Sequence, residues 1–317
     1  MRPVAVAGVD VGGTKIQTAV VRNGSVVGSD RVKTPERGPD EVMDAIAASV
    51  RRALEQSGES EVTGVGIGTP GETDEETGVV SRAGNVPGFS GTVELGSEIG
   101  KRLDGVPVRI NNDVRVATLG EYHRGAGRGF QDVLGVFVGT GVGGGLILGG
   151  ELRTGRGAAG EIGHTVVRHE GRKCSCGRRG CLEAYAGRGC MEARARKLAA
   201  DGRTTILFDL MEHKGRDRFT SGVFAAALQD GDDMTRELID DAVWALGVGI
   251  ASAQNLLDVE AIVIGGGLGD RLGGPFIDRI RDSMQPHLFV PDRAPRVAGS
   301  ELRDLSGAVG AAVFAGG

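Results

Sequence analysis

The fold is decided by Asp10-Val-Gly-Gly-Thr-Lys15, a glycine-rich stretch that directly follows the apolar run Val4–Val9. We expect its glycines to adopt positive φ and to bring backbone N–H groups close to a bound anion. Gly12, Gly13 and Thr14 would then offer hydrogen-bond donors to a phosphate, Lys15 a compact positive charge, and Asp10 a carboxylate that holds Mg²⁺ through water. The alternative is an ordinary glycine-rich β-turn with a solvated lysine.

A second glycine-rich stretch favours the phosphate interpretation. Gly139-Thr-Gly-Val-Gly-Gly-Gly145 follows the apolar run Val133–Val138, with Thr140 and Gly141 at its tip. Two such loops in one chain predict two cradles for the phosphates of a nucleotide, because a series of backbone N–H groups forms a concave anion site.

Between the two loops, the strand-like run Val108–Ile110 leads into Asn111-Asn112-Asp113. The carboxyl ends of strands in open α/β sheets are where ligands bind. A carboxylate placed there predicts a general base that accepts the proton of a hydroxyl while a phosphoryl group is transferred to it, with Asn112 orienting the hydroxyls. The alternative is an Asx turn or a helix N-cap, since residues 114–122 have a helical pattern.

Length and charge limit the class of protein. The chain has 317 residues and a formal net charge of −5, which predicts two domains and argues against nucleic acid as a partner. We find no apolar run long enough to span a bilayer and no secretory signal at the start Met1–Asp10, so we expect a cytoplasmic protein with no membrane partner.

The order of elements predicts an α/β fold. Short β-branched runs at Val4–Val9, Ile16–Val21 and Val26–Val32 indicate an antiparallel three-stranded start, and Pro39–Gln56 has the spacing of an amphipathic helix. A buried strand at Val62–Ile67 follows. Further on we expect helices at Leu95–Leu103, Met234–Leu257 and Phe276–Met284, and a strand at Ala261–Ile264.

After Gly125–Gly129 the pattern of strand, glycine loop and hairpin begins again. We therefore expect a first domain at residues 1–120 and a second at residues 121–303. The small apolar segment Leu305–Ala315 has helical spacing and is expected to complete the first domain, as part of residues 304–317.

Three of the four cysteines predict a metal site. Cys174, Cys176 and Cys181 fall in one short glycine-containing segment, and His164 lies upstream. Three thiolates and an imidazole are the ligand set of a closed, structural tetrahedral Zn²⁺ site. The alternative is three ordinary reduced cysteines. Cys190 is expected to serve only in packing.

The zinc would also place polar side chains near the acceptor. We expect it to fix Glu161, His164 and Glu183 on the wall of the pocket for the acceptor, because a metal-bound histidine can hydrogen-bond through its second ring nitrogen. Without zinc, Glu161 and Glu183 would be surface carboxylates.

Taken together, these motifs resemble the ROK group of bacterial sugar kinases, typified by glucokinases, within the actin-like ATPase superfamily. The resemblance covers nearly the whole chain and depends on both glycine loops, Asn112-Asp113, Gly160-Glu-Ile-Gly-His164, the cysteine segment through Glu183, and Ile264-Gly-Gly-Gly267. It implies two ribonuclease H-like domains with a cleft between them, and ATP bound in that cleft.

The resemblance also implies roles for single residues. Phosphates would lie at Gly12–Thr14 and Thr140–Gly141, adenosine near Gly266, and Asp113 would be the base. The sugar would be held by Asn85, Asn112, Asp113, Glu161, His164 and Glu183. ATP, Mg²⁺ and structural Zn²⁺ are the expected cofactors, and a homodimer or homotetramer is expected.

The chain departs from the usual pattern on the acceptor side. Val114-Arg115 replaces Ala-Asn, Gly84 replaces proline, and Phe89 replaces tryptophan. Glucose phosphorylated to glucose 6-phosphate is the first expectation. N-acetylmannosamine, N-acetylglucosamine, fructose, allose or a C7-cyclitol would satisfy the same polar groups, and polyphosphate is an open alternative to ATP as donor.

Two other classes remain as alternatives. Some members of the group are sugar-sensing regulators without kinase activity, and these carry a winged helix ahead of the first glycine loop, for which Asp10 leaves no room. An actin-like filament protein is the other, although it would have little use for a zinc-braced polar pocket.

Overall fold

The computed structural model describes residues 4–316, and its contacts divide the chain into two compact units. Unit 1 comprises the chain up to Gly135, Gly145–Gly160 and the chain from Glu301, and unit 2 comprises Val136–Gly144 and Glu161–Ser300. Residues 1–3 and 317, which belong to the expected first domain and its expected closing helix, lie outside the described residues.

Unit 1 contains a five-stranded mixed sheet with the order β3-β2-β1-β4-β8. Its strands are β1 (Ala5–Val11), β2 (Lys15–Arg22), β3 (Ser25–Lys33), β4 (Val65–Thr69) and β8 (Val108–Asn112). The first three are antiparallel neighbours, as the sequence predicted, whereas β4 runs parallel to both β1 and β8. The carboxyl ends of β1, β4 and β8 therefore lie at the same edge of the sheet.

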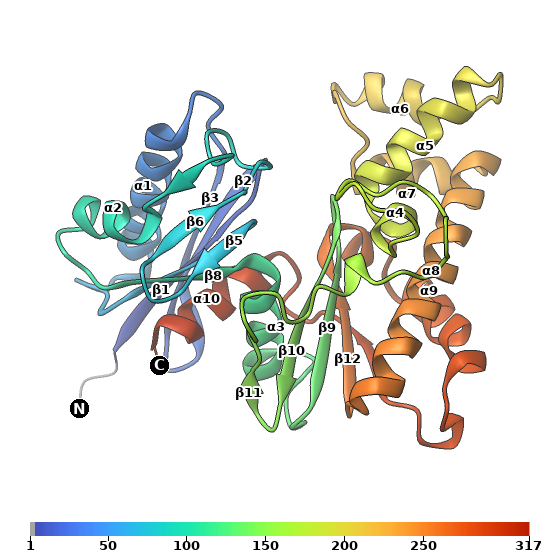
Figure 1. Ribbon diagram of the computed structural model, residues 1–317. Helices are drawn as coiled ribbons and strands as arrows, with labels where there is room; N and C mark the ends of the chain where they lie inside the picture. The colour runs from blue at the N-terminus through green and yellow to red at the C-terminus, as the bar shows by residue number, and fades with distance from the viewer. Residues whose placement is uncertain (1–3, 317) are drawn as a thin grey trace. The chain divides into compact units, whose positions relative to one another are not determined.

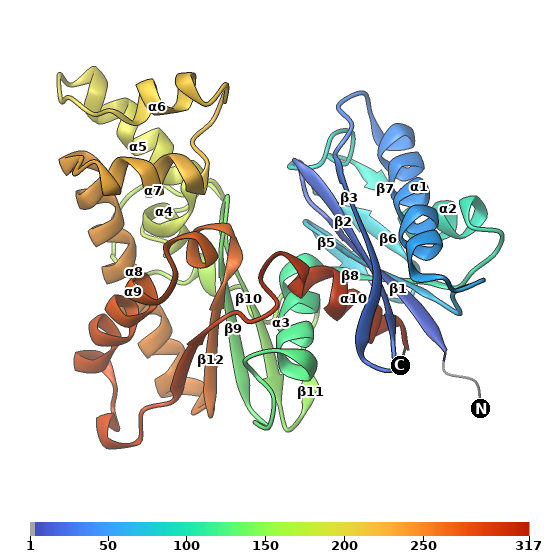
Figure 2. The same cartoon turned by 180° about the vertical axis from the view of Figure 1, so that it is seen from behind.

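Helices cover both faces of this sheet (Figures 1 and 2). They are α1 (Pro39–Ser57), α2 (Leu95–Arg102), α3 (Asp113–Arg124) and α10 (Ser306–Gly316). Side chains alternate along β1, so Ala7 and Val9 share a buried cluster with α1 and α2, whereas Gly8 faces α10. A Cβ on Gly8 would lie 1.9 Å from the carbonyl oxygen of Ala308, so only glycine allows this close approach.

A buried carboxylate fixes the start of α10 to α3. Glu121 of α3 is fully buried and accepts hydrogen bonds from the N–H groups of Glu301 (3.0 Å) and Leu302 (2.9 Å) and from the Ser306 hydroxyl (2.7 Å). A buried carboxylate is tolerated only when its oxygens are hydrogen-bonded in this way. Asp304, which follows this anchor directly, is thereby held near the first glycine loop, where it pairs with Lys15.

A smaller sheet in unit 1 was not predicted. Its strands are β5 (Glu72–Asp74), β6 (Val79–Ser81) and β7 (Thr92–Val93), in the order β5-β6-β7. The sequence indicated only a region punctuated by glycine and proline here, because strands this short carry no clear alternation of apolar and polar residues.

A second five-stranded sheet has the order β11-β10-β9-β12-β13. Its strands are β9 (Val133–Val138), β10 (Val142–Leu148), β11 (Glu151–Leu152), β12 (Ala261–Gly265) and β13 (Arg296–Gly299). A hairpin is followed by strands that add on the other side of its first strand, which is the order of the first sheet. The repetition predicted from the glycine loops is thus confirmed at the level of strand order.

Helices make up most of unit 2. They are α4 (Glu183–Ala186), α5 (Arg188–Ala200), α6 (Leu207–His213), α7 (Ser221–Gln229), α8 (Asp233–Leu257) and α9 (Gly266–Met284). Short 3₁₀ turns occur at Ile162–His164, Gln285–His287 and Pro291–Arg293 in unit 2 and at Arg303–Leu305 in unit 1. Helix α9 packs on α8, β12 and β13 (Figure 2) and begins at Gly266 rather than at the predicted Phe276, with a kink at Gly273 before Pro275. Across residues 4–316, none of the helices combines the length and the apolar character needed to span a membrane.

Candidate active site

Two carboxylates of unit 1 come together at the carboxyl edge of its sheet. Asp10 on β1 pairs in register with Gly68 on β4, and Gly68 pairs with Asn111 on β8, directly before Asn112 and Asp113. Burial, and then the negative charge of Asp113, raise the pKa of Asp10 to about 7, against the opposing influence of Lys15. Asp113 is therefore close enough to Asp10 for its charge to influence the ionisation of Asp10.

The side chains of Asn112 and Asp113, where β8 meets α3, both accept hydrogen bonds from the first turn of the helix. The side-chain oxygen of Asn112 accepts hydrogen bonds from the N–H groups of Val114 (3.0 Å) and Arg115 (3.3 Å), so the helix-cap role belongs to Asn112. Asp113 begins the helix and accepts a bond from Val114 N at 2.9 Å through Oδ1. Asn111 is buried and donates to Glu75 at 2.9 Å, which holds the turn before β6 against the end of β8.

Arg115 and Phe89, two of the residues that depart from the usual pattern, both have contacts within unit 1. Arg115 is buried and its guanidinium donates to the carbonyl oxygen of Gly157 at 2.6 Å, so its charge is directed to a loop of unit 1. Phe89 is fully buried in the core of unit 1. Its backbone bonds with Ala83 and Val86 shape the loop that carries Asn85, which is itself exposed.

The first glycine loop is a tight turn between β1 and β2. Gly12 N donates to the carbonyl of Lys15 at 2.9 Å, and Thr34 binds the carbonyls of Gly12 and Thr14. Within residues 4–316, the N–H groups of Gly13 and Thr14 have no hydrogen-bond acceptor. The turn therefore presents two unused donors on an exposed surface, which is what an anion site requires.

The second glycine loop, between β9 and β10, presents donors in a similar way. The carbonyls of Gly139 and Thr140 accept bonds from the first two N–H groups of α5, at 3.1 and 2.9 Å, and Gly139 N donates to Gly141 O at 2.8 Å. The N–H groups of Thr140 and Gly141 have no acceptor in the described part of the chain. The bonded carbonyls thus fix the loop, and these two N–H groups remain available to a ligand.

The expectation that these loops need positive φ is wrong. Left-handed φ occurs at many glycines of this chain, but not at Gly12, Gly13, Gly139 or Gly141. Two of these glycines allow a close approach instead. A Cβ on Gly13 would lie 2.1 Å from the carbonyl oxygen of Asn85, and one on Gly141 would lie 2.3 Å from the carboxylate of Glu183. Gly266 has φ +83, and its Cβ would lie 2.7 Å from Val138 N.

In unit 2, Glu183 connects the second glycine loop to the cysteine segment. It is 9% exposed, and its Oε2 accepts a bond from Val142 N at 3.0 Å. Its Oε1 accepts a bond from the Ser175 hydroxyl at 2.5 Å and lies 3.6 Å from Cys174 Sγ. Ser175 was not among the predicted site residues, although its position between two cysteines was a usable signal. Glu161, by contrast, is exposed directly before the 3₁₀ turn that carries His164.

The four predicted zinc ligands lie together. One ligand atom from each of His164, Cys174, Cys176 and Cys181 falls within 4.8 Å of the others. Cys174 Sγ is 3.8 Å from His164 Nδ1, and Cys176 Sγ is 3.8 Å from Cys181 Sγ. Tetrahedral Zn²⁺ with Zn–S bonds of about 2.3 Å places neighbouring sulfurs about 3.8 Å apart. The donor set and its spacing therefore fit zinc.

The cysteines of this cluster differ in acidity. Burial raises the pKa of Cys174 to about 12. For Cys176, partial burial acts in the same direction, but hydrogen bonds involving the backbone and side chain of Arg178 lower the pKa to about 6. Metals bind the deprotonated thiol, so this lowered pKa favours a metal at the cluster.

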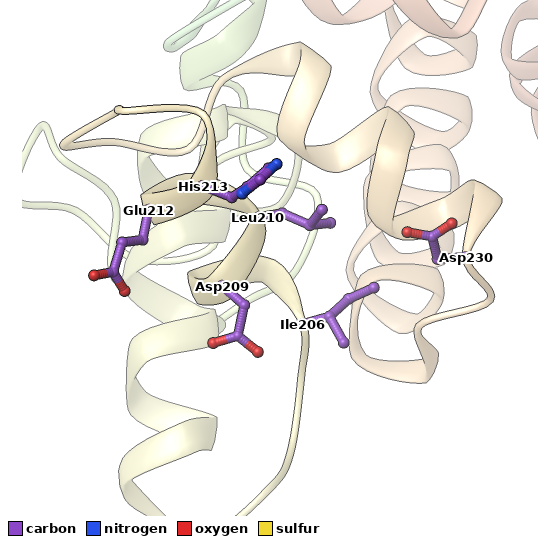
Figure 3. Close-up of a pocket in the computed structure, with 6 residues that line it drawn as sticks. All are labelled: Ile206, Asp209, Leu210, Glu212, His213 and Asp230. Atoms are coloured by element: carbon purple, nitrogen blue, oxygen red, sulfur yellow. The ribbon is translucent and has the colours of Figure 1, made fainter.

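A pocket in unit 2 contains none of the predicted site residues. It is lined by residues of α6, by Ile206 directly before that helix and by Asp230 after α7. They are shown as sticks in Figure 3: Ile206, Asp209, Leu210, Glu212, His213 and Asp230. Its lining includes neither a glycine loop nor a cationic cradle for the phosphates of a nucleotide, so we assign no role in catalysis to it.

The raised pKa of Asp10 gives a prediction about stability. We expect Asp10→Asn to raise the melting temperature at pH 8 and to leave it nearly unchanged at pH 4. An aspartate whose pKa rises from 3.8 to about 7 on folding favours the folded state only when protonated. The free energy of unfolding therefore falls as the pH rises from about 4 to about 7, by an amount on the order of 1–4 kcal/mol, and the asparagine variant avoids this loss.

The measurement is thermal unfolding at the two pH values without divalent cations. Asp30→Asn is the matched control, because hydrogen bonds from Arg52 outweigh partial burial and lower the pKa of Asp30. Its carboxylate stabilises the fold at pH 8, so this control should lower the melting temperature there. An Asp10→Asn protein that is less stable than the parent at pH 8 would contradict the prediction.

The chain was compared with known proteins. The family model described as the ROK family matches residues 6–317. A glucokinase of Streptomyces coelicolor is 36% identical over 97% of this chain and 96% of its own length. An N-acetyl-D-glucosamine kinase of Shigella boydii is 31% identical over 96% of this chain and 97% of its own length.

A solved structure shows the same architecture. The crystal structure of a ROK family glucokinase from Streptomyces griseus, in complex with glucose and AMPPNP, superposes with a TM-score of 0.82 at 34% identity. The match covers 98% of this chain and 99% of that one. The α/β fold with mixed sheets is therefore the fold of these kinase structures.

Proposed function

Because the chain belongs to the ROK family, we propose that it is an ATP-dependent kinase that phosphorylates a hydroxyl of a hexose, with glucose as the first expected acceptor. One observation of the structure carries most weight. Asp113 follows β8 directly at the carboxyl edge of the sheet, and β8 is separated by one strand from β1, which leads into the first glycine loop and carries Asp10. A base next to a phosphate cradle is the arrangement that phosphoryl transfer to an alcohol needs.

We assign the donor side to the two glycine loops. The unused N–H groups of Gly13 and Thr14, and those of Thr140 and Gly141, would receive phosphate oxygens. The positive φ of Gly266 brings the start of α9 against the backbone of Val138, where we place the adenosine. Asp10 would hold Mg²⁺ through water, and the metal would neutralise charge on the transferred phosphoryl group. Lys15 contributes less than expected, because its amine is paired with Asp304.

We assign the acceptor side to Asp113 and to the polar side chains expected around the sugar. Asp113 would accept the proton of the attacking hydroxyl as the P–O bond forms. The remaining sugar contacts would come from the expected set, Asn85, Asn112, Glu161, His164 and Glu183. For His164, Nδ1 faces the cysteines, which leaves Nε2 for a hydroxyl. Glu183 would exchange its bond with the Ser175 hydroxyl for one with the sugar, since a hydroxyl can turn to another partner.

The acceptor is tested with a panel of sugars. We expect ATP-dependent release of ADP with glucose, measured by a coupled assay, and lower kcat/KM with N-acetylglucosamine, N-acetylmannosamine, fructose, allose and a C7-cyclitol. The physical reason is that a polar pocket rejects an acceptor that leaves its buried groups unpaired. A higher kcat/KM for any other member of the panel would replace glucose as the acceptor. Substituting polyphosphate for ATP in the same assay tests the donor, and no turnover with any pair would overturn the kinase proposal.

A further inference from the structure

Arg188 is a positively charged side chain without a negative partner beside the second glycine loop. It is the first residue of α5, and its guanidinium donates to the Thr140 hydroxyl at 3.1 Å and to the carbonyl of Phe219 at 3.3 Å. Its Nε is buried and has no hydrogen-bond partner. None of the ion pairs among residues 4–316 includes Arg188.

The surroundings of Arg188 increase its need for an anion. Burial, and then the positive charge of Arg218, lower the pKa of Arg188. Glu192, whose negative charge opposes this shift, is occupied by Arg218 and Arg196, at 3.0 and 2.8 Å. An arginine remains charged at neutral pH, so a partly desolvated guanidinium without a counter-charge is unfavourable until an anion binds.

The same place offers neutral donors for that anion. The carbonyls of Gly139 and Thr140 are turned to α5, where they accept bonds from the backbone of Arg188 and Gly189. The N–H groups of Thr140 and Gly141 have no acceptor in the described residues. A guanidinium together with backbone N–H groups is the combination that binds phosphate oxygens in proteins. Because the first N–H groups of α5 are already occupied, the guanidinium and the loop, and not the helix terminus, make up this site.

We propose that Arg188 binds a phosphate group of the nucleotide at the loop Gly139–Gly141 and is the cation of unit 2 that receives the phosphoryl donor. The proposal rests on the proposed kinase function and adds a binding residue to it. It also explains how the donor side acquires positive charge, since the amine of Lys15 in unit 1 is neutralised by Asp304. During transfer, negative charge shifts towards the phosphates that remain with the leaving ADP, where a fixed guanidinium would stabilise it.

The test is binding of three ligands that differ in phosphate content. Arg188→Gln keeps a donor near Thr140 but removes the charge. We expect it to weaken binding of AMPPNP and ADP by roughly 10- to 100-fold, the effect of losing a charged hydrogen bond, and to leave adenosine binding within about twofold. Isothermal titration calorimetry measures all three. Arg188→Lys, which keeps the charge without the planar fork, should give an intermediate loss.

Arg203→Gln is the matched control, because it removes the same charge from unit 2 at an exposed pair with Glu237. Its affinities should equal those of the parent. Unchanged AMPPNP affinity in Arg188→Gln, or an equal loss for adenosine, would overturn the proposal. Either result leaves the kinase function standing if Asp113→Asn still abolishes turnover, whereas failure of the parent protein to bind nucleotide or turn over any acceptor would refute the kinase function itself.

Discussion

Replacing Asp113 by asparagine is expected to lower kcat by about three to four orders of magnitude while the protein stays folded and binds nucleotide normally. A hydroxyl is a poor nucleophile until a nearby carboxylate accepts its proton, and a positioned base contributes about 10²–10⁴ in rate. Orientation of the acceptor by the same carboxylate adds to the loss. Steady-state kinetics with saturating glucose and ATP measure the effect.

The structure makes this substitution a clean one. Asp113 accepts a bond from Val114 N at 2.9 Å through Oδ1, and the amide oxygen of an asparagine side chain can accept the same bond, so the start of α3 is preserved. Asn112 continues to cap the helix. The change therefore removes the proton acceptor and keeps this contact at the start of α3, and the melting temperature should remain close to that of the parent.

Asp233→Asn is the matched control for Asp113→Asn. Asp233 is also the first residue of a helix, α8, and also follows a residue whose side chain caps that helix. It lies on the surface of unit 2 in an exposed pair with Arg236. This control should retain full turnover. If Asp113→Asn keeps near-normal kcat, Asp113 is not the base, and the carboxylate of Asp10 becomes the next candidate.

Motifs that depend on neighbouring residues in the sequence could be predicted well. The antiparallel start of the first sheet and its repetition in the second follow from apolar runs placed before glycine loops, since a buried strand and its turn are recognised within about ten residues. The cysteine cluster was also predictable, because three of its four ligands fall in one short segment. Asp113 could be placed at the sheet edge because β8 ends directly before it.

Long-range contacts account for what the sequence did not predict. Helix α5 was missed because it is rich in charge and buries Met191, Ala195 and Leu198 together with Glu192, so its inner face is not purely apolar. The role of glycine at Gly13 and Gly141 was misjudged for a related reason. Asn85 and Glu183 approach these two glycines closely, although they are distant from them in sequence. No local sequence pattern indicates such an approach.

The second large effect concerns the metal. We expect the protein as purified to contain about one Zn²⁺ per chain, and Cys181→Ser to lose the metal and more than ~10 °C of melting temperature. Structural zinc contributes about 10–16 kcal/mol in small zinc-dependent peptides, so losing one of four ligands should remove several kcal/mol here. Elemental analysis and thermal unfolding measure the two quantities. Cys190→Ser is the matched control, because Cys190 lies outside the cluster, and it should keep both.

The segment that carries the cysteines contains no helix and no extended strand. Between Thr165 and Leu182 the backbone forms turns and two isolated bridges, Val166 with Cys181 and Lys173 with Arg179. Its arginines should therefore become sites of tryptic cleavage in Cys181→Ser and remain protected in Cys190→Ser. Equal protection in both variants would show that side-chain packing, and not zinc, orders the segment.

Loss of zinc should also affect the second glycine loop, because Glu183 contacts both this loop and the cysteine segment. That carboxylate accepts a bond from Ser175, which lies between Cys174 and Cys176 of the predicted zinc cluster, and another from Val142 N at the end of the second glycine loop. If the cysteine segment unfolds, Glu183 loses its bond with Ser175 and the loop loses a fixed neighbour. We therefore expect Cys181→Ser to bind AMPPNP more weakly than the parent while Cys190→Ser does not, as measured by calorimetry at a temperature where both remain folded. If the zinc-free protein keeps full nucleotide affinity, the cysteine segment does not influence the second glycine loop, and the metal stabilises only its own segment.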